Sequence, residues 1–340
     1  MEHFTAHRLT FTLYVQTLLE LNEHQGSALR GALFHALRRR FCAFARQPDL
    51  ECSGCALAPA CPVATLVSTL NPQHARGQDR PRPFTIQPPL PGSGHPWELP
   101  DDRFAFRYEP GEALTFGLTL YAGAMTLFPY VVLALQDFEE GGLGRACQQY
   151  DGRWRRGQVT VREIWAANPL TGEQQPVLRE GSRQVYVPDI PVTHAQVLAR
   201  AGAWQPQAGG VTLNFTTPTR LVERGHLLKP ETFRFRPFFQ RLLERLEALS
   251  EAFCDSPLAV DFPALLSAAE AVRTVENRLL WEDVASYSTR RHAESPIGGL
   301  VGRVTLAAED WSPFFPWLLW GQFTHVGKDA VKGNGLIRVE

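Results

Sequence analysis

The same order of expected secondary-structure elements occurs in both halves of the chain, and this repetition limits the fold more than any other feature. Patterns of apolar residues predict strand, helix, strand, strand, helix, glycine-rich loop and strand in the first half, and the same order again in the second. Two βαββαβ units in tandem are the ferredoxin-like split motif used twice. We therefore expect an α+β protein of two ferredoxin-like (RRM-like) domains, spanning residues 1–205 and 206–340.

In the first half, alternation of apolar and polar residues predicts a strand at 8–16, and helical spacing predicts a helix at 27–41. The helix has one apolar face and a second face on which His35, Arg38 and Arg39 fall together. The remaining expected elements are strands at 83–87, 112–121 and 158–165, a helix at 127–138, and a glycine loop at 139–147.

The second half opens with an expected strand at 209–221 and an amphipathic helix at 237–253. Asp261 is expected to cap a further short helix, helped by Pro263 in its first turn. The remaining expected elements are strands near 278–288 and 299–306, a helix at 311–322 with Ser312 as its cap, a glycine-rich loop at 327–335 and a terminal strand. The stretch AGAWQPQAGG interrupts the pattern near residues 200–210 and sets the domain boundary.

The net charge of −1 gives the chain no overall basic field, so any binding of nucleic acid must come from local patches. Only three of its 34 basic residues are lysines. The arginines gather at 38–40, at 153–156 around Trp154, at 234 and 236, and at 290–291. Because arginine binds phosphate in bidentate fashion and stacks on bases, this bias fits RNA. A GC-rich genome is the alternative explanation, and composition alone favours it.

Four of the six cysteines lie in an insertion at residues 42–62, with the spacing C-x9-C-x2-C-x5-C. The chain shows no secretory signal, so we expect thiolate ligands rather than disulfides. The predicted site is a structural zinc held by four thiolates, and an iron-sulfur cluster is the alternative. The predicted ligands are Cys42, Cys52, Cys55 and Cys61. The isolated Cys147 and Cys254 are expected to be small buried residues.

The chain is expected to be cytoplasmic. Its N-terminal residues lack the charged and apolar regions of a signal peptide. Residues 113–136 carry no charge, but the alternating pattern at their start and Pro129 within them indicate a buried strand and helix rather than a membrane span.

Three segments resemble a known family. The sequence FTHVGKDAVKGNGLIRV at 323–339 resembles the glycine-rich loop of the RAMP superfamily, specifically of the CRISPR-associated repeat endoribonucleases that cut precursor CRISPR RNA. The segment SYSTRRHAESPIGGLVGRVTL at 286–306 resembles that family's basic hairpin and the glycine-containing strand after it. GSALRGALFHALRRRFC at 26–42, with cysteines following, is similar to the family's N-terminal pattern. The resemblance spans roughly 25–62, 110–145 and 281–338.

The resemblance implies two ferredoxin-like domains, with RNA held between them and by the glycine-rich loop. Loop amides and two lysines would then meet phosphates, while Tyr287 and its neighbouring arginines would stack on bases and bind phosphates. The predicted RNA-binding residues are Arg38, Arg39, Tyr287, Arg290, Arg291, Gly327, Lys328, Lys332, Gly333 and Gly335. In the alternative interpretation, the glycines only form a tight turn and the lysines are solvated.

The resemblance also implies metal-independent cleavage, in which a ribose 2′-hydroxyl attacks the neighbouring phosphate to give a 2′,3′-cyclic phosphate and a 5′-hydroxyl. This chemistry needs a base, an acid and cations. His35 is the predicted catalytic residue, and His24 is the alternative. The first 228 residues contain no lysine, so an arginine must replace the lysine that assists catalysis in the family.

The implied partners are CRISPR repeat RNA or its processed product, and other subunits of a CRISPR effector complex. A rival hypothesis is a RAMP subunit that holds guide RNA and cuts nothing. The histidine on the basic helix face favours the nuclease.

Overall fold

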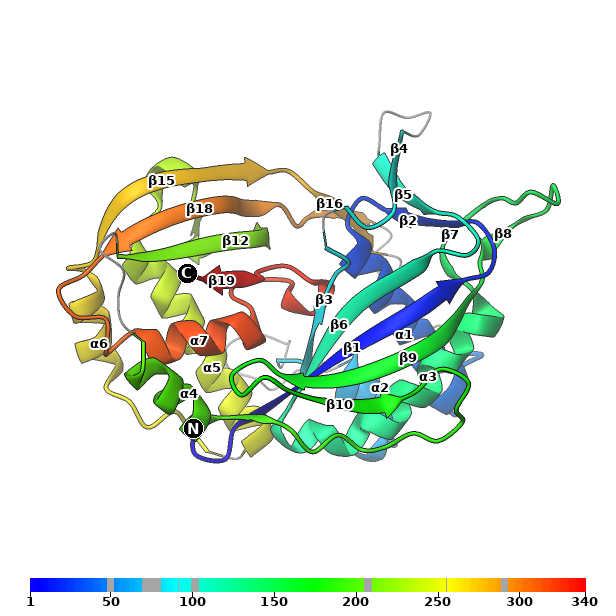
Figure 1. Ribbon diagram of the computed structural model, residues 1–340, viewed down its shortest axis with the longest axis horizontal. Helices are drawn as coiled ribbons and strands as arrows, with labels where there is room; N and C mark the ends of the chain where they lie inside the picture. The colour runs from blue at the N-terminus through cyan, green and yellow to red at the C-terminus, as the bar shows by residue number, and fades with distance from the viewer. Residues whose placement is uncertain are drawn as a thin grey trace. The chain divides into compact units, whose positions relative to one another are not determined.

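The computed structural model describes residues 1–47, 52–68, 81–90, 92–98, 104–204, 210–254, 256–288 and 293–340. The chain forms two compact units, one of residues 7–191 and one that joins residues 1–6 to 192–340 (Figure 1). The predicted boundary at 205–206 lies outside the described residues. The two units divide between residues 191 and 192, and α4 (His194–Gly202), just after this point, packs on α7 (Phe315–Thr324) of the second unit.

The main sheet of the first unit has the strand order β10-β9-β1-β6-β3. The strand β9 is antiparallel to both β1 and β10, and β3 is antiparallel to β6. Without the added edge strand β10, this is the ferredoxin-like order, and the helices α1 and α3 pack together across one face of the sheet. Every strand and helix predicted in this half is present. The elements are β1 (Thr5–Val15), α1 (Gln25–Phe41), α2 (Pro62–Leu66), β3 (Phe84–Gln87), β6 (Ala113–Tyr121), α3 (Phe128–Gly141), β9 (Val159–Asn168) and β10 (Glu173–Leu178).

A second sheet in this unit was not predicted. Its order is β4-β5-β2-β7-β8. It contains β2 (Leu19–Asn22), β4 (His95–Glu98), β5 (Phe104–Tyr108), β7 (Leu143–Gln148) and β8 (Trp154–Gly157). The interpretation of 139–147 as a glycine loop was wrong, because Gly144 lets two strands approach closely. A Cβ atom there would lie 2.2 Å from the carbonyl oxygen of Glu20.

The second unit contains a four-stranded sheet with the order β15-β18-β12-β19, which is again the ferredoxin-like order. In its core, Phe235 of α5 packs edge to face with Trp311, and Phe239 of α5 packs edge to face with Phe314. Short hairpins β13–β14 and β16–β17 are added to it. The elements are β11 (Val192–Thr193), β12 (Val211–Thr219), β13 (Val222–Glu223), β14 (His226–Leu227), α5 (Phe235–Cys254), α6 (Phe262–Ala269), β15 (Arg273–Glu282), β16 (Ala285–Ser288), β17 (Ala293–Pro296), β18 (Gly299–Ala307) and β19 (Ile337–Val339).

The two predicted helix caps in this unit have different outcomes. Asp261 caps α6, because its carboxylate accepts the N–H of Ala264 at 2.9 Å. Ser312 does not cap α7, which begins only at Phe315. The Ser312 hydroxyl instead donates to Asp310 at 2.7 Å, in the turn before the helix. No helix in the described part of the chain is long and apolar enough to span a bilayer.

Candidate active site

His35 lies on the exposed side of α1, and the buried side of the helix holds it there. Leu29, Leu33 and Leu37 of α1 are buried in the core of the first unit. The imidazole of His24 accepts the N–H of Ser27 at 3.2 Å and so caps the helix. His24, the alternative catalytic residue, therefore has a structural task at the first turn.

The predicted residues His35, Arg38 and Arg39 come together in one pocket of about 400 Å³. Helical spacing already placed the three side chains on one face. The structure adds Arg156 of β8 to the lining of the pocket, together with Gly141 at the end of α3. Arg156 belongs to the basic group that the sequence shows around Trp154, but nothing in the sequence connects that group to the first helix.

The pocket arginines of α1 are held by groups outside that helix. The nearly buried carboxylate of Asp137 on α3 accepts hydrogen bonds from Arg39 at 2.9 Å and from Arg40 at 3.1 Å. Gly141 leaves room for Arg39, since a Cβ atom there would lie 2.3 Å from its guanidinium. Arg38 donates to the carbonyl of Gln47 at 2.8 Å. These guanidinium groups are therefore positioned before any ligand binds.

The surroundings of His35 favour its neutral form. Partial removal from water lowers the pKa of the imidazole below its usual value of 6.5. Arg156, and then three arginines of its own helix, lower this pKa further, because they repel a second positive charge. A neutral imidazole can accept a proton, so His35 has the protonation state of a general base near neutral pH.

The glycine-rich loop follows α7 and forms a tightly packed corner of the second unit. Gly327, Gly333 and Gly335 all have positive φ angles, of 85°, 94° and 74°. At two of them the backbone also passes close to another chain segment. A Cβ atom on Gly327 would lie 2.5 Å from the carbonyl oxygen of Arg220, and one on Gly335 would lie 2.0 Å from that of Val326.

Five N–H groups of this loop are used inside the protein. Lys328 donates to the carbonyl of Arg220 at 3.2 Å and Gly335 to that of Pro218 at 3.1 Å, while Lys332, Gly333 and Asn334 donate to carbonyls within the loop. The N–H of Leu336, just after the loop, donates to the hydroxyl of Thr217 at 3.0 Å. His325 is buried and donates through Nδ1 to the carbonyl of Asn334 at 2.9 Å. The tight-turn interpretation thus accounts for the glycines, and a phosphate cradle would have to use other amides.

The two lysines of the loop differ in their surroundings. Lys328 is exposed. Lys332 is half-buried and pairs with Asp329 at 2.9 Å, which offsets its charge. Lys328 is therefore the better placed of the two for meeting an RNA phosphate.

The other predicted RNA-binding residues of this half are described only in part. Tyr287 lies in β16, in register with Glu294 of β17, and the structure describes its backbone alone. Arg290 and Arg291 lie outside the described residues. Their part in RNA binding stays a prediction from the sequence.

The structure does not gather the four cysteines into a metal site. Cys42, Cys52, Cys55 and Cys61 are free thiols, each half-buried. Among the described residues, no three side chains of His, Cys, Asp or Glu form a group that could hold a metal ion. As placed, the four thiols do not fit zinc or an iron-sulfur cluster, and metal binding stays a prediction that rests on spacing alone.

Two family models match the chain. One covers residues 4–190 and is described as an N-terminal domain, and the other covers residues 213–337 and is described as CRISPR-associated endoribonuclease Cas6. No curated protein matches the chain. The two βαββαβ units and the family match of residues 213–337 agree with a CRISPR-associated endoribonuclease of the RAMP superfamily. Over residues 213–337, the chain matches the Cas6 family of CRISPR-associated endoribonucleases.

Solved structures share the fold over the whole chain. A Cas6 product complex matches with a TM-score of 0.53 and 16% identity, covering 99% of both chains. Thermus thermophilus Cas6 matches with a TM-score of 0.53 and 15% identity over the same share. A chain in a partial Cas6-RT-Cas1–Cas2 complex matches with a TM-score of 0.59 and 12% identity, where all of this chain covers 46% of that one.

Proposed function

We propose that this endoribonuclease cuts precursor CRISPR RNA within its repeats, at the pocket that contains His35. One observation carries the proposal: in a chain whose residues 213–337 match the Cas6 family, a histidine whose pKa is lowered lies in a pocket with three arginines. A general base beside several cations is what attack by a 2′-hydroxyl on a phosphate requires.

In the proposed reaction, neutral His35 takes the proton from a ribose 2′-hydroxyl. The oxygen attacks the adjacent phosphorus, and the bond from phosphorus to the 5′ oxygen of the next nucleotide breaks. The products are a 2′,3′-cyclic phosphate and a 5′-hydroxyl, after the leaving oxygen has taken up a proton.

The arginines of the pocket stabilise the negative charge that develops on the phosphate. Arg39 is already held by Asp137, and Arg38 by the carbonyl of Gln47, so neither has to be ordered during the reaction. Arg156 has no ion pair among the described residues, and its guanidinium is free to bind phosphate in bidentate fashion. Arginine thus supplies the positive charge in a half of the chain that has no lysine.

The substrate proposed here is a CRISPR repeat RNA, and the product is the mature guide. Similar solved structures include a Cas6 product complex and a Cas6-RT-Cas1–Cas2 complex. By that likeness, we propose that the chain can stay with its product or meet other CRISPR-associated subunits. Exposed Lys328 is the proposed phosphate contact of the glycine-rich loop.

The test is cleavage of a repeat RNA from the genome that encodes the chain, with EDTA present. Wild-type protein is compared with His35→Ala and with His226→Ala, in which a second exposed histidine is changed. We expect His35→Ala to lower the single-turnover rate at least about 10²-fold, because it removes the base, and His226→Ala to leave it unchanged. An RNA with a 2′-deoxy nucleotide at the cut site should not be cleaved.

The remaining outcomes separate the alternatives. Tight binding without cleavage by wild-type protein would place the chain among subunits that only hold guide RNA. Cleavage of the 2′-deoxy substrate would exclude attack by the 2′-hydroxyl. Unimpaired cleavage by His35→Ala would move the search for the base to His24.

A further inference from the structure

The hairpin that carries Arg156 into the pocket also presents a large exposed aromatic side chain. Trp154 begins β8 and is 70% exposed, although tryptophan is usually well buried. Side chains alternate along a strand, so Trp154 and Arg156 point to the same face of the sheet, about 7 Å apart along the strand. No bulge separates them, since Gln148 and Ala146 of β7 lie directly opposite.

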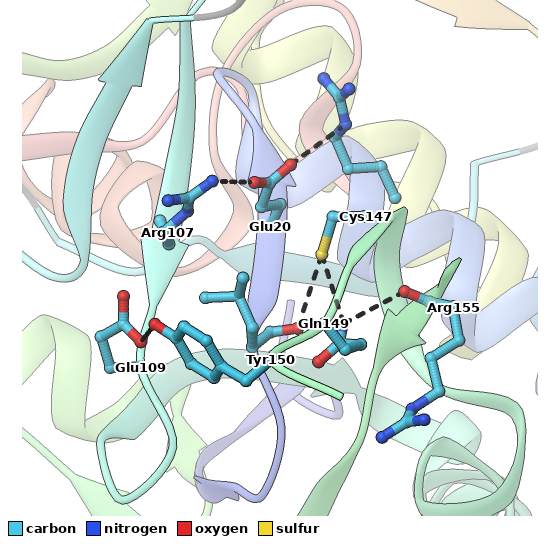
Figure 2. Close-up of polar contacts among 9 residues, drawn as sticks. Glu20, Arg107, Glu109, Cys147, Gln149, Tyr150 and Arg155 are labelled. Carbon is cyan, nitrogen blue, oxygen red and sulfur yellow. Dashed lines mark hydrogen bonds and ion pairs between the residues drawn. The ribbon is translucent and has the colours of Figure 1, made fainter. Parts of the chain in front are cut away.

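Trp154 is held on a rigid hairpin. Gln149 is buried at the turn, and its side-chain amide donates to the carbonyl of Leu18 at 2.9 Å and to that of Arg155 at 3.2 Å. Figure 2 shows Gln149 between Cys147 and Arg155 in these contacts. The backbone N–H of Gln149 also donates to the carbonyl of Arg153 at 2.9 Å. A ligand on Trp154 would therefore not have to order the hairpin first.

The charges on the two faces of the hairpin differ. On the face opposite to Trp154, Arg155 pairs with Asp151 at 2.7 Å. Glu20 pairs there with Arg107 at 2.6 Å, as Figure 2 shows. On the face of Trp154, by contrast, Arg156 has no carboxylate partner among the described residues. That face therefore combines an aromatic surface with uncompensated positive charge.

We propose that Trp154 is a stacking platform for an unpaired base of the substrate RNA, next to the phosphate that is cut. The inference rests on the proposed function of the His35 pocket and names where the adjacent nucleotide binds. Arg156 holds the scissile phosphate, and the neighbouring base lies flat on the indole of Trp154. Stacking of this kind accepts any base, because every base has a π-face.

The experiment measures RNA binding separately from cleavage. The probe is the repeat RNA with a 2′-deoxy nucleotide at the cut site, together with a series in which one unpaired position at a time lacks its base. The variants are Trp154→Ala and Trp154→Phe. Tyr186→Ala, which removes another exposed aromatic side chain of the same unit, is the matched control. If the wild-type protein cuts nothing, the 2′-deoxy substitution is omitted, and the affinities of the Trp154 and Tyr186 variants alone test the stacking platform.

We expect Trp154→Ala to raise Kd by about 5- to 100-fold, the cost of losing one stacked base. Trp154→Phe should restore most of the affinity, and Tyr186→Ala should bind as wild type. In the series of RNAs that each lack one base, the loss of one particular base should weaken binding to wild-type protein and leave the Kd for Trp154→Ala unchanged. That position should flank the cut.

Two results would overturn the inference. The first is equal affinity of Trp154→Ala and Tyr186→Ala for the RNA, and the second is a sensitive position away from the mapped cut. Neither result depends on the rate of His35→Ala. Failure of the cleavage mechanism and failure of the stacking platform therefore give different data.

Discussion

Arg156 connects the charge of the pocket to the pH dependence of cleavage. It is the arginine with the largest effect on His35, and like the others it lowers the pKa of the imidazole. The folded pKa lies below 6.5, so the neutral base is present at neutral pH and is lost as the pH falls through that lowered value. In kcat/KM, the acid limb of wild-type protein should therefore have its midpoint below pH 6.5.

Replacing Arg156 by glutamine should move that midpoint to higher pH. The variant removes a positive charge that opposes protonation of His35, so the base is lost sooner on acidification. We also expect the maximal rate to fall about 10- to 100-fold, because a phosphate contact is lost. Arg162→Gln is the control, since Arg162 pairs with Glu180 away from the pocket. An unchanged midpoint in Arg156→Gln would show that the arginine does not act on His35.

At the scale of elements, the glycine-rich loop shows how close packing limits substitution. Gly335→Ala would put a Cβ atom 2.0 Å from the carbonyl oxygen of Val326 and force a residue with a side chain to a φ of 74°. Gly181→Ala imposes the same φ of 74° in open space. We expect the control to lose about 1 kcal/mol of unfolding free energy and Gly335→Ala to lose about 3 kcal/mol or more. Urea unfolding measures both, and equal losses would show that the close approach costs nothing.

The cysteine-rich insertion gives a prediction that the sequence alone supports. Four cysteines with this spacing should bind about one zinc per chain, measured by elemental analysis of protein purified under reducing conditions. Changing Cys52 and Cys55 together to serine should remove the metal, whereas Cys254→Ser should keep it. Iron with visible absorbance would favour a cluster instead. Protein that carries neither metal when purified anaerobically would refute metal binding.

The sequence predicted the elements that have a periodic pattern of apolar residues within one segment. It missed the features that depend on contacts between segments far apart in the chain. The helix with His35 and the strands of both ferredoxin-like sheets follow from periodicity, so they were found. The strand β7 was read as a loop, because its glycine, Gly144, serves a close approach to Glu20 that only the folded chain shows. Asp137 and Arg156 were missed for the same reason: both join the site from elements far along the chain.

At the scale of the whole molecule, the repeated order of elements was enough to predict two ferredoxin-like units. It did not show that residues 1–6 belong to the second unit, together with residues 192–340. Residues 1–6 pack with 192–340, since Thr5 and Ala6 of β1 pair with β11, and the buried ring of Phe4 lies 5.1 Å from that of Trp320. Such a contact has no periodic signature in the sequence.

Removing the Phe4 ring should therefore destabilise the unit that contains α7. We expect Phe4→Ala to lower the unfolding free energy by about 3–5 kcal/mol, the usual cost for a buried phenylalanine, and Glu2→Ala, at an exposed position, to change little. Hydrogen exchange should locate the loss in α7 and α4. A loss confined to residues 7–191 would contradict this assignment of the N-terminal residues.

This arrangement also bears on the order in which the chain is made. Residues 1–6 are translated before residues 7–191, but the strand β11 and the helix α7 with which they pack are translated much later. At about 5–20 residues per second, they wait on the order of ten seconds to a minute for these partners. The unit of residues 7–191 can form during that interval. Residues 1–6, by contrast, can pack only after β11 and α7 have been made.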